Sequence, residues 1–571
     1  MDHPNPSNWD EITNVLQHFS AKKRRFSVQE QADYGQFFGK GAAFITFSYG
    51  IDGVSIEISK YAHALENLFS RLGTYSIHLI GESFQPETSS IFGADWHQFR
   101  LAGVDGWDKW DGGIWFNALF RKKIRSRSKR SRCLAEEIYI QAISIADRLG
   151  KYLIENRISL LIPVNVASNP GNLAATLGIV LATEALGIYV LNNNHDFYWE
   201  GGKSLAERDP GEVPGVRDHF FRNIKNRSLF KLISLLYPWN GKRWLQVNIN
   251  ARQSRKLIQK YNFPKDKVFE ISTSISDQFL ESYNLDDTKH ARVRMAHILS
   301  NGKAIMHSIS VDGHIERLDQ WMKNQTPCIV GSHSELTVDP RSEDLIILLQ
   351  PTRIVGRKRI AKNVAFIEAL LTKSRLRADF ENNPFRQIVL HISGPTPIEH
   401  KADLIQVLRA YQKTVNSLPE FIAPRFLMAF STGHDQHASF SEHNFSPMSI
   451  EDIYRMANLV VFPSSTEGRG LPIIEASAMG IPIVCSRYQP KEVFEDVIGK
   501  HLPTELQIQY IHFPERKFSQ AFLSEVASVL LDSTIQKKYR TYNRRAVKSR
   551  YSRGSFNTKF EGLLEHLGKL D

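Results

Sequence analysis

The chain of 571 residues is too long for one hydrophobic core, so we expect two or more domains. Its contents of 42% hydrophobic and 23% charged residues are ordinary for a globular protein. The three cysteines, Cys133, Cys328 and Cys485, lie far apart, which excludes a disulfide framework and favours a reducing compartment. The first residues are polar and the apolar windows are short, so we expect a cytoplasmic protein.

The net charge of +12 is concentrated in two segments. One runs from Arg121 to Arg132 (RKKIRSRSKRSR) and the other from Lys537 to Arg553, and each holds eight basic residues and no acidic residue. The rest of the chain is therefore net negative, which excludes a generally basic nucleic-acid binder. Each segment is compatible with a solvated helix face, with peripheral contact to anionic lipid at the inner face of a membrane, or with a phosphorylated acceptor.

The first half of the chain alternates strand and helix patterns, which is typical of a parallel α/β sheet. We predict an N-terminal extension over residues 1–39, with a short helix at 9–19, and a first domain over residues 40–284. A strand at 44–47 runs into a loop with Gly50 and Gly53. The predicted elements after this loop are a helix at 55–68, a strand at 76–80, an irregular segment at 82–132, a helix at 133–156, a strand at 160–166, a helix at 173–186, a strand at 188–191 and a last unit at 244–275.

A histidine and an aspartate, His195 and Asp196, follow the strand at 188–191. Ligands bind at the carboxyl ends of the strands in open α/β sheets. The aromatic residues 197–199 continue the same loop. The position therefore makes His195 a candidate site residue.

The second half repeats the α/β pattern after a segment that is harder to interpret. We predict an insertion and linker over residues 285–341, a second domain over residues 342–540 and closing helices over residues 541–571. A continuous apolar strand at 345–349 ends in a basic loop that contains Arg353 and Lys358. A helix at 363–371 and a strand at 387–392, which ends at Gly394, come next.

The most informative stretch runs from Val460 to Ser486 and reads VVFPSSTEGRGLPIIEASAMGIPIVCS. It predicts a strand at 459–462, a glycine-containing loop, a helix at 473–479 and a strand at 481–485. The helix N-terminus offers N–H groups and a positive dipole end to a phosphate. Two carboxylates frame the loop, Glu467 within the turn and Glu475 on the helix, and both can accept hydrogen bonds from sugar hydroxyls.

The segment PSSTEGRGLPIIEASAMGIPIV resembles the donor-site signature of retaining GT-B glycosyltransferases, specifically glycosyltransferase family 4 (group 1). The resemblance covers residues 345–560 well and residues 42–275 weakly. It implies an α/β protein of GT-B architecture, in which two Rossmann-like domains with parallel sheets face each other across a cleft. The first domain would bind the acceptor and the second the nucleotide sugar, and the closing helices would cross back to the first domain.

The resemblance also implies the reaction, a retaining transfer of a hexose from a nucleoside-diphosphate sugar to an acceptor hydroxyl without a metal or other cofactor. The catalytic residues would be His195, which binds the sugar, Glu467, which positions it, and Arg353 and Lys358, which receive the departing diphosphate. The implied donor-binding residues are Gly53, Arg353, Lys358, Gly394, Glu467, Gly468, Arg469, Gly470, Leu471 and Glu475. The sugar, the nucleotide and the acceptor, whether a saccharide, a lipid or a small phosphorylated metabolite, stay open.

The sequence departs from the family pattern in three places. Arg469 replaces the usual aromatic residue, Asn458 stands where an aspartate is common, and the segment 285–340 is extra. Residues 431–447 are rich in histidine, but their spacing matches no standard site, so we predict no metal. Two alternatives remain, a sugar-nucleotide epimerase of the GT-B fold and a non-catalytic GT-B scaffold associated with membranes.

Overall fold

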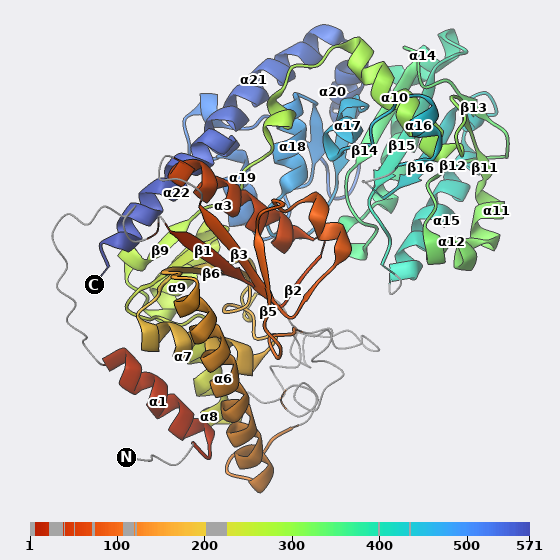
Figure 1. Ribbon diagram of the computed structural model, residues 1–571. Helices are drawn as coiled ribbons and strands as arrows, with labels where there is room; N and C mark the ends of the chain where they lie inside the picture. The colour runs from red at the N-terminus through yellow and green to blue at the C-terminus, as the bar shows by residue number, and fades with distance from the viewer. Residues whose placement is uncertain are drawn as a thin grey trace. The chain divides into compact units, whose positions relative to one another are not determined.

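The computed structural model describes residues 6–21, 38, 40–50, 52–70, 75–106, 119, 123–200, 225–397, 400–432 and 436–570. The chain divides into two compact units (Figure 1). The first comprises Met1–Thr273 and Phe556–Asp571, and the second comprises Ser274–Ser555. Both units are α/β with a predominantly parallel sheet, which confirms the predicted class of two Rossmann-like domains.

The first unit is built on a parallel sheet with the strand order β5-β3-β1-β6-β7-β8-β9. The strands are β1 (Gly41–Ile45), β3 (Ser76–Gly81), β5 (His97–Arg100), β6 (Leu160–Pro163), β7 (Tyr189–Asn194), β8 (Trp244–Asn248) and β9 (Val268–Glu270), and the short strands β2 (Ser48–Tyr49) and β4 (Ser83–Phe84) form a separate pair. The helices are α1 (Trp9–Ala21), α3 (Gly53–Phe69), α6 (Lys129–Glu155), α7 (Leu173–Leu186), α8 (Arg227–Leu236), α9 (Ala251–Tyr261) and α22 (Arg553–Gly568), with 3-10 turns at Pro86–Ser90 and Lys265–Lys267.

Helices cover both faces of this sheet because its strands are apolar on both sides. In β1, Ala43 and Ile45 join a core with α1, α6, α7 and α8. Ala42 and Phe44 face the other way and join a core with α3 and α22. The segment predicted as an N-terminal extension thus contributes Trp9 to the core of the first unit.

The second unit is built on a sheet with the order β11-β12-β16-β15-β14-β17-β18-β19, in which only β12 and β16 pair antiparallel among the described residues. Its strands are β11 (Ile309–Ser310), β12 (Cys328–Gly331), β14 (Leu345–Gln350), β15 (Gln387–Ser393), β16 (Phe426–Ser431), β17 (Leu459–Phe462), β18 (Ile483–Cys485) and β19 (Ile511–His512), with a separate pair of β10 (Met306–His307) and β13 (Thr337–Val338). The helices are α10 (Leu285–Leu299), α11 (Val311–Glu316), α12 (Leu318–Asn324), α13 (Ala361–Lys373), α14 (Arg375–Asn382), α15 (Lys401–Ser417), α16 (Ser439–Glu442), α17 (Ile450–Arg455), α18 (Leu471–Met479), α19 (Lys491–Ile498), α20 (Gln520–Leu531) and α21 (Ser533–Tyr551), with 3-10 turns at Asp277–Leu280, Gly356–Lys358, Ala423–Arg425 and Thr504–Leu506.

The segment 285–341, predicted as an insertion and linker, is an integral part of the second unit. Helix α10 begins with a capping box between Asn284 and Asp287 and packs on the core, while β11 and β12 extend the sheet at one edge. Strands of two and four residues carry too little periodicity to be recognised in a sequence, which explains the different assignment. The boundary between the units lies at Thr273 and Ser274 rather than after residue 284, because Ile275 and Phe279 belong to the core of the second unit.

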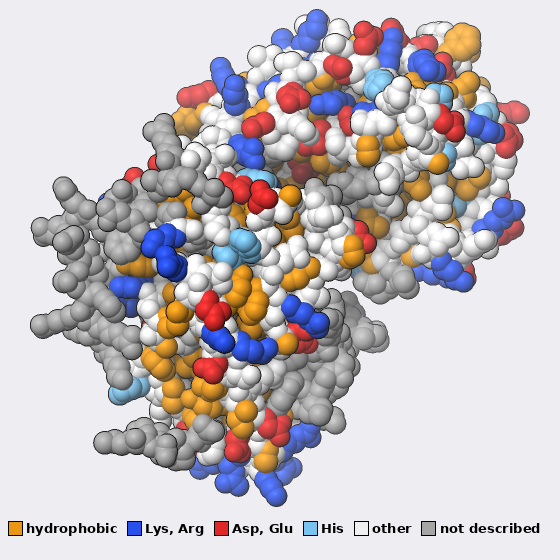
Figure 2. All heavy atoms as spheres, viewed as in Figure 1, with side chains coloured by type: hydrophobic (Ala, Val, Ile, Leu, Met, Phe, Trp, Pro, Cys, Tyr) orange, Lys and Arg blue, Asp and Glu red, His pale blue; other side chains and the backbone are white. Residues whose placement is uncertain are grey.

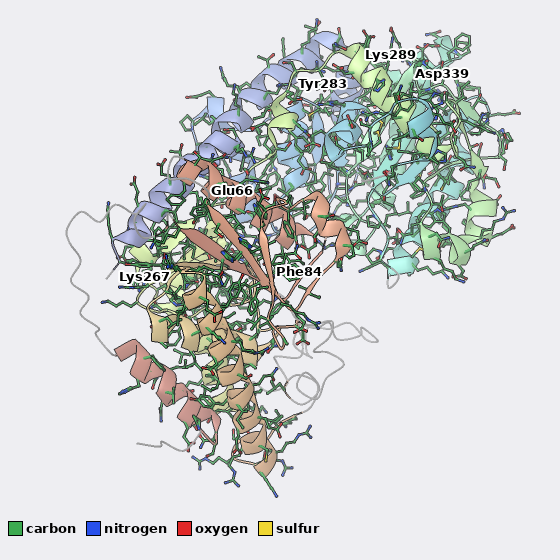
Figure 3. All side chains as sticks on the ribbon, in the orientation of Figure 1. Glu66, Phe84, Lys267, Tyr283, Lys289 and Asp339 are labelled. Atoms are coloured by element: carbon green, nitrogen blue, oxygen red, sulfur yellow. The ribbon has the colours of Figure 1, made fainter. Side chains whose placement is uncertain are left out.

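The second basic segment, Lys537 to Arg553, lies largely on α21 and has a structural role. Arg544 donates hydrogen bonds to the carbonyls of Leu280 and Glu281, and Arg550 donates to the carbonyl of Asp496 at 2.6 Å. The Arg540 guanidinium lies 4.9 Å from the ring centre of Tyr283, a residue labelled in Figure 3. These arginines therefore attach α21 to its own unit. In the described part of the chain, no helix has both the length and the apolar character needed to cross a membrane.

Candidate functional site

Two loops meet at the carboxyl ends of β14 and β17 in the second unit. These strands are parallel neighbours, so their carboxyl ends open on the same edge of the sheet. The backbone N–H of Ser465 donates to the carbonyl of Arg357 at 2.8 Å, and the Arg357 guanidinium returns a bond to the carbonyl of Thr466 at 2.7 Å. Arg359 adds a bond from Nε to the carbonyl of Pro463 at 2.8 Å. The two loops therefore form one connected surface.

A buried ion pair lies where these loops meet. Lys358 Nζ is 2.5 Å from Glu467 Oε1, and both side chains are only 9% exposed. Burial lowers the pKa of Lys358, the charge of Glu467 opposes that shift, and the charges of Arg357 and Arg353 add to it. Arg357 also lies 3.4 Å from the other carboxylate oxygen of Glu467. The carboxylate is thus held from two sides by cations.

Arg353 and Gly394 lie close together at the ends of β14 and β15. Arg353 is exposed, and its charge reaches Lys358. Gly394 has a φ of +154°, and a Cβ at this position would come within 2.7 Å of the backbone nitrogen of Arg353. Any larger residue would displace the backbone that carries Arg353.

The loop after Glu467 leads into α18 without a side-chain cap. Gly470 is the N-cap residue with a φ of +65°, and its missing Cβ would lie 2.1 Å from the hydroxyl of Tyr488. Leu471 begins the helix, Arg469 is half-buried, and a Cβ on Gly468 would meet no atom within 4 Å. An uncapped helix N-terminus beside a glycine with open space around it can accept an anion.

Glu475 lies on the second turn of α18. Its Oε2 accepts a hydrogen bond of 2.6 Å from the hydroxyl of Tyr454, which α17 contributes. Tyr454 is completely buried, and burial, reinforced by the charge of Glu475, raises the pKa of its phenol. The tyrosine therefore stays a neutral donor that fixes the orientation of the Glu475 carboxylate.

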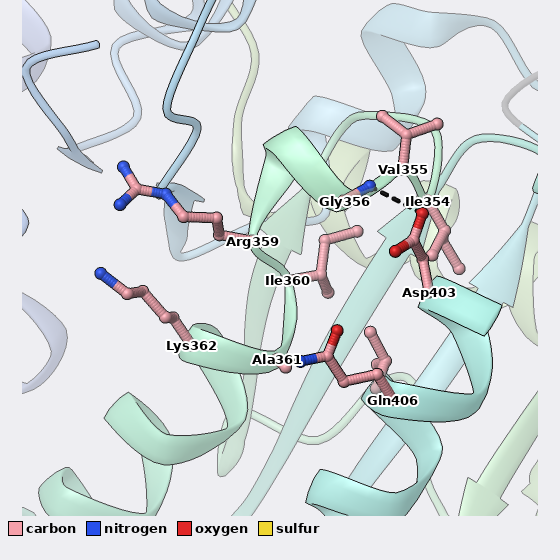
Figure 4. A pocket seen from close by; sticks show the side chains of 10 residues that line it. Ile354, Val355, Gly356, Arg359, Ile360, Ala361, Lys362, Asp403 and Gln406 are labelled. Carbon is pink, nitrogen blue, oxygen red and sulfur yellow. Dashed lines mark hydrogen bonds between the residues drawn. The ribbon is translucent and has the colours of Figure 1, made fainter. Parts of the chain in front are cut away.

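The β14 loop also lines a pocket of about 240 Å³ with α13 and α15 (Figure 4). Asp403 on α15 accepts a bond from the backbone N–H of Gly356 at 2.8 Å and lies 2.7 Å from a ring nitrogen of His400. Arg359 and Lys362 extend away from Asp403 and pair with Glu515. Asp403 thus holds the loop backbone two residues before Lys358.

The first unit contains two of the predicted site residues, His195 on the loop after β7 and Gly53 at the start of α3. His195 follows β7, and Gln253 Nε2 donates to its carbonyl at 3.0 Å and to the Glu200 carboxylate at 2.7 Å. Burial raises the pKa of Glu200. Gly53 begins α3, where the Asp52 carboxylate caps the N–H of Ser55, and a Cβ on Gly53 would meet no atom within 4 Å.

The structure brings most of the predicted donor residues together within the second unit. Lys358 and Glu467 are in direct contact, Arg353 and Gly394 adjoin them at the neighbouring strand ends, and residues 468–471 continue from Glu467. His195 and Gly53 belong to the first unit. The sequence did not single out Tyr454 or Tyr488, because each lies on a different element from the residue it contacts. Arg357 was also missed, although it adjoins Lys358 in the sequence. The high density of basic residues in that loop could have pointed to it.

The predicted absence of a metal site concerns residues 431–447. His434 lies outside the described residues, whereas His437 contacts Ser439 at 2.9 Å and Asn301 at 3.2 Å. Within the described ranges, no group of three or more histidine, cysteine, aspartate or glutamate residues is arranged to hold a metal ion.

Comparisons with known proteins bear on this site. Residues 427–531 match the family model described as glycosyl transferases group 1, a range that contains both Glu467 and Glu475. Mannosylglucosylglycerate synthase of Petrotoga mobilis is 23% identical over 455 residues, which cover 76% of this chain and 80% of that protein.

Two solved structures with a similar fold have TM-scores of 0.48. One is a glycosyltransferase from Rickettsia africae ESF-5, with 12% identity and coverage of 93% of this chain and 99% of the other. The second is Anabaena HepE in complex with UDP and glucose, with 9% identity and coverage of 92% and 99%. The family match and the Petrotoga relative confirm the prediction of a glycosyltransferase enzyme, with the group 1 similarity located in the second unit.

Proposed function

We propose that this enzyme transfers a hexose from a nucleoside-diphosphate sugar to an acceptor hydroxyl, with retention of anomeric configuration and without a metal. The observation that carries the proposal is the buried contact between Lys358 and Glu467, at strand ends beside the uncapped start of α18. The group 1 match over the same loop supports it.

The cations of the site are suited to a departing diphosphate. Negative charge builds up on this leaving group during transfer, and preorganised donors in a site with little water stabilise it most. Lys358 is already desolvated, and Arg353 is exposed earlier in the same loop, where its guanidinium can bind two phosphate oxygens. The backbone N–H groups that follow Gly468 lie at the positive end of the α18 dipole, which would also stabilise the diphosphate.

The two glutamates have different surroundings, which suits different roles. Glu467 is held by Lys358 and Arg357 and would orient the transferred sugar through its hydroxyls. Glu475 is oriented by Tyr454 and would bind the ribose diol. Because most of the rate would come from orientation and charge stabilisation, no protein nucleophile is required.

The first unit would supply the acceptor side and one sugar contact. Gln253 fixes the backbone carbonyl of His195, so the histidine is presented on a rigid loop. Its imidazole would hydrogen-bond the hydroxyls of the transferred sugar. Gly53, with open space at its Cβ position, would allow close approach of the donor phosphates to the start of α3.

A thermal-shift screen of the full chain against UDP, GDP, ADP and their hexose conjugates tests donor binding. A donor at 100 times its dissociation constant should stabilise the second unit by about 2.7 kcal/mol. The shift should disappear in Arg353→Ala and persist in Arg377→Ala, an exposed arginine on α14. If no nucleoside diphosphate shifts the transition of the wild-type chain, donor binding is refuted.

Two further measurements test the finer parts of the proposal. Activity with the binding donor should survive treatment with EDTA, since the residues above replace a metal. Proton NMR of the product should show the anomeric configuration of the donor. Inversion, or activity that EDTA abolishes and magnesium restores, would contradict the mechanism.

Peripheral contact with an anionic membrane belongs to the same proposal. In the part of the basic segment that the structure describes, Lys123, Arg125, Arg127, Lys129, Arg130 and Arg132 are all exposed. These basic residues lie just before α6 and in its first turn. Later turns of α6 carry a hydrophobic surface, and Figure 2 shows basic and hydrophobic side chains over this helix. Basic residues near anionic lipid contribute about 1 kcal/mol each. The chain should co-sediment with phosphatidylglycerol vesicles but not with phosphatidylcholine vesicles. This co-sedimentation should be lost when Arg125, Arg127 and Arg130 are changed to serine. Equal sedimentation with both lipids would refute the contact.

A further inference from the structure

A second pocket lies at the β11 edge of the sheet in the second unit, where residues of the short helices α11 and α12 line it. It has a volume of about 340 Å³ and shares no lining residue with the candidate donor site. Small-molecule pockets span about 300–1,000 Å³ and combine apolar walls with a few polar groups. This pocket is therefore large enough for one small ligand.

Its most unusual lining residue is a histidine. His314 is 2% exposed, and its buried ring nitrogen Nε2 has no hydrogen-bond partner among the residues that the structure describes. Burial lowers the pKa of His314 to about 4, so the ring is neutral at physiological pH and has one donor and one acceptor nitrogen. Buried polar groups without partners are rare in native proteins, and a bound ligand is one way to satisfy them.

The aromatic side chain of Trp321 lies next to this histidine and lines the pocket. The indole N–H of Trp321 donates to the carbonyl of Thr326 at 2.8 Å, so the side chain offers the pocket apolar ring surface rather than a polar edge. The ring lies edge-on to His314, with centres 5.2 Å apart, and to Phe430, with centres 5.9 Å apart. Trp321 is therefore fixed in place while still partly exposed.

The rim of the pocket carries uncharged hydrogen-bonding groups and one cation. Ser310 and Ser334 each accept one backbone N–H bond, at 3.1 Å in both cases, so their hydroxyl protons remain to be donated. Gln320, Asn324 and Arg317 are exposed and also line the pocket. The lining contains no carboxylate, so it offers no negative charge to a metal ion or a cationic ligand.

We propose that this pocket binds a pyranose unit of a saccharide, with the C–H face of the sugar against Trp321 and its hydroxyls bonded to His314, Gln320 and Asn324. A pyranose has both the apolar face and the alternating donors and acceptors that the lining matches. A phosphate-rich ligand fits less well, because the pocket offers it a single exposed guanidinium. The proposal does not depend on the assignment of the donor site.

Binding is tested by saturation-transfer NMR of the full chain with the methyl glycosides of glucose, mannose and galactose in both anomeric forms, and with inorganic phosphate as the counter-probe. At least one glycoside should receive saturation. Its affinity should fall about tenfold or more in Trp321→Ala and in the double variant Gln320→Ala/Asn324→Ala, since each removes direct contacts. The exposed glutamine Gln520, changed to alanine, is the matched control and should leave binding unchanged.

The double variant alters only exposed side chains, so it keeps the test valid if Trp321→Ala fails to fold. Binding that persists in Glu467→Ala but is lost in the pocket variants supports the second site. Saturation of no glycoside, binding of phosphate alone, or binding that is lost in Glu467→Ala and retained in the pocket variants would overturn it.

Discussion

Lys358 and Glu467 stabilise each other in an environment where neither charge is well solvated. Removal of one partner from a buried pair costs about 3–5 kcal/mol, because the other charge stays buried without compensation. We expect Glu467→Gln to approach this loss, since it leaves Lys358 near Arg357 and Arg353 without the carboxylate. Lys358→Met should cost less, because Glu467 keeps its contact with Arg357 and a desolvated cation is removed.

Chemical denaturation, followed by a probe that reports on the second unit, measures the free energy of unfolding of both variants. Lys362→Met, which disrupts a more exposed pair with Glu515, is the control and should change stability by about 0–1 kcal/mol. Both site variants should lower kcat by about 10²–10³-fold, as for the loss of one preorganised donor. A larger loss of stability in Lys358→Met than in Glu467→Gln would show that the desolvation argument is wrong.

The lowered pKa of Lys358 also predicts how activity depends on pH. Burial disfavours the charged amine, so the proton leaves below the ordinary lysine value of 10.5 as the pH rises. Activity that needs the cation should fall in this range, while the folded state gains stability there because it binds fewer protons than the unfolded chain. In Lys358→Arg the guanidinium stays charged, so the alkaline loss of activity should move to higher pH or vanish. An unchanged alkaline limb in the pH profile of kcat would exclude Lys358 as its source.

At the residue scale, the sequence suggests candidate site residues, but it does not predict which neighbours hold them. The resemblance to the donor-site signature of the family, together with the basic loop that contains Arg353 and Lys358, led to the candidate site. The direct contact of Lys358 with Glu467 and the bond from Tyr454 to Glu475 join residues 109 and 21 positions apart. Such contacts depend on which strands are neighbours, and residue spacing alone does not specify this.

At the scale of elements, the start of α18 depends on the absence of a side chain at Gly470. An alanine there adopts a left-handed conformation at a cost of about 1–2 kcal/mol, and its Cβ would also meet the hydroxyl of Tyr488 at 2.1 Å. Tyr488 is 1% exposed, and its hydroxyl has no hydrogen-bond partner among the described residues. We therefore expect Gly470→Ala to destabilise the second unit strongly and Tyr488→Phe to be nearly neutral.

The double variant Gly470→Ala/Tyr488→Phe should recover part of the loss, because the nearest remaining ring atom would lie 3.0 Å from the new Cβ. Thermal unfolding of the four proteins in this cycle measures the coupling. Gly468→Ala, where a Cβ meets no atom within 4 Å, is the matched control. Strict additivity of the two changes would contradict the close approach at Gly470.

Elements with ordinary hydrophobic patterns were predictable, and those with unusual residues were not. The helix Leu173–Leu186 and the strand Leu459–Phe462 have the predicted bounds. Strand β7 continues through three asparagines, which disfavour strands in general. The buried amides of Asn192 and Asn194 donate to Gln246 and Asn248 on β8, so polar pairs across the two strands replace apolar packing on this face.

At the scale of the whole molecule, the last helix returns the chain to its first unit. Phe556 and Phe560 on α22 pack edge-on against Tyr61 on α3, with ring centres 4.9 and 5.0 Å apart. The same core includes Leu563, Leu564 and Leu567. The family resemblance implied that closing helices cross back to the first domain. The point of return could not be predicted, because α21 and α22 have similar helical patterns and join within two residues.

This return predicts that a change in the last helix destabilises the first unit selectively. Phe560 is completely buried, so Phe560→Ala should cost about 3–5 kcal/mol, whereas Glu565→Ala on the exposed face of α22 should be nearly neutral. Hydrogen exchange should show faster opening of β1 and α3, which share the Phe560 core, and unchanged protection of β14 and β15 in the second unit. Because the second unit has its own cores, its response to nucleoside diphosphates should survive the substitution. Equal loss of protection in both units would mean that they unfold together as one cooperative body. The division of the chain at Thr273 and Phe556 would then not correspond to separate unfolding units.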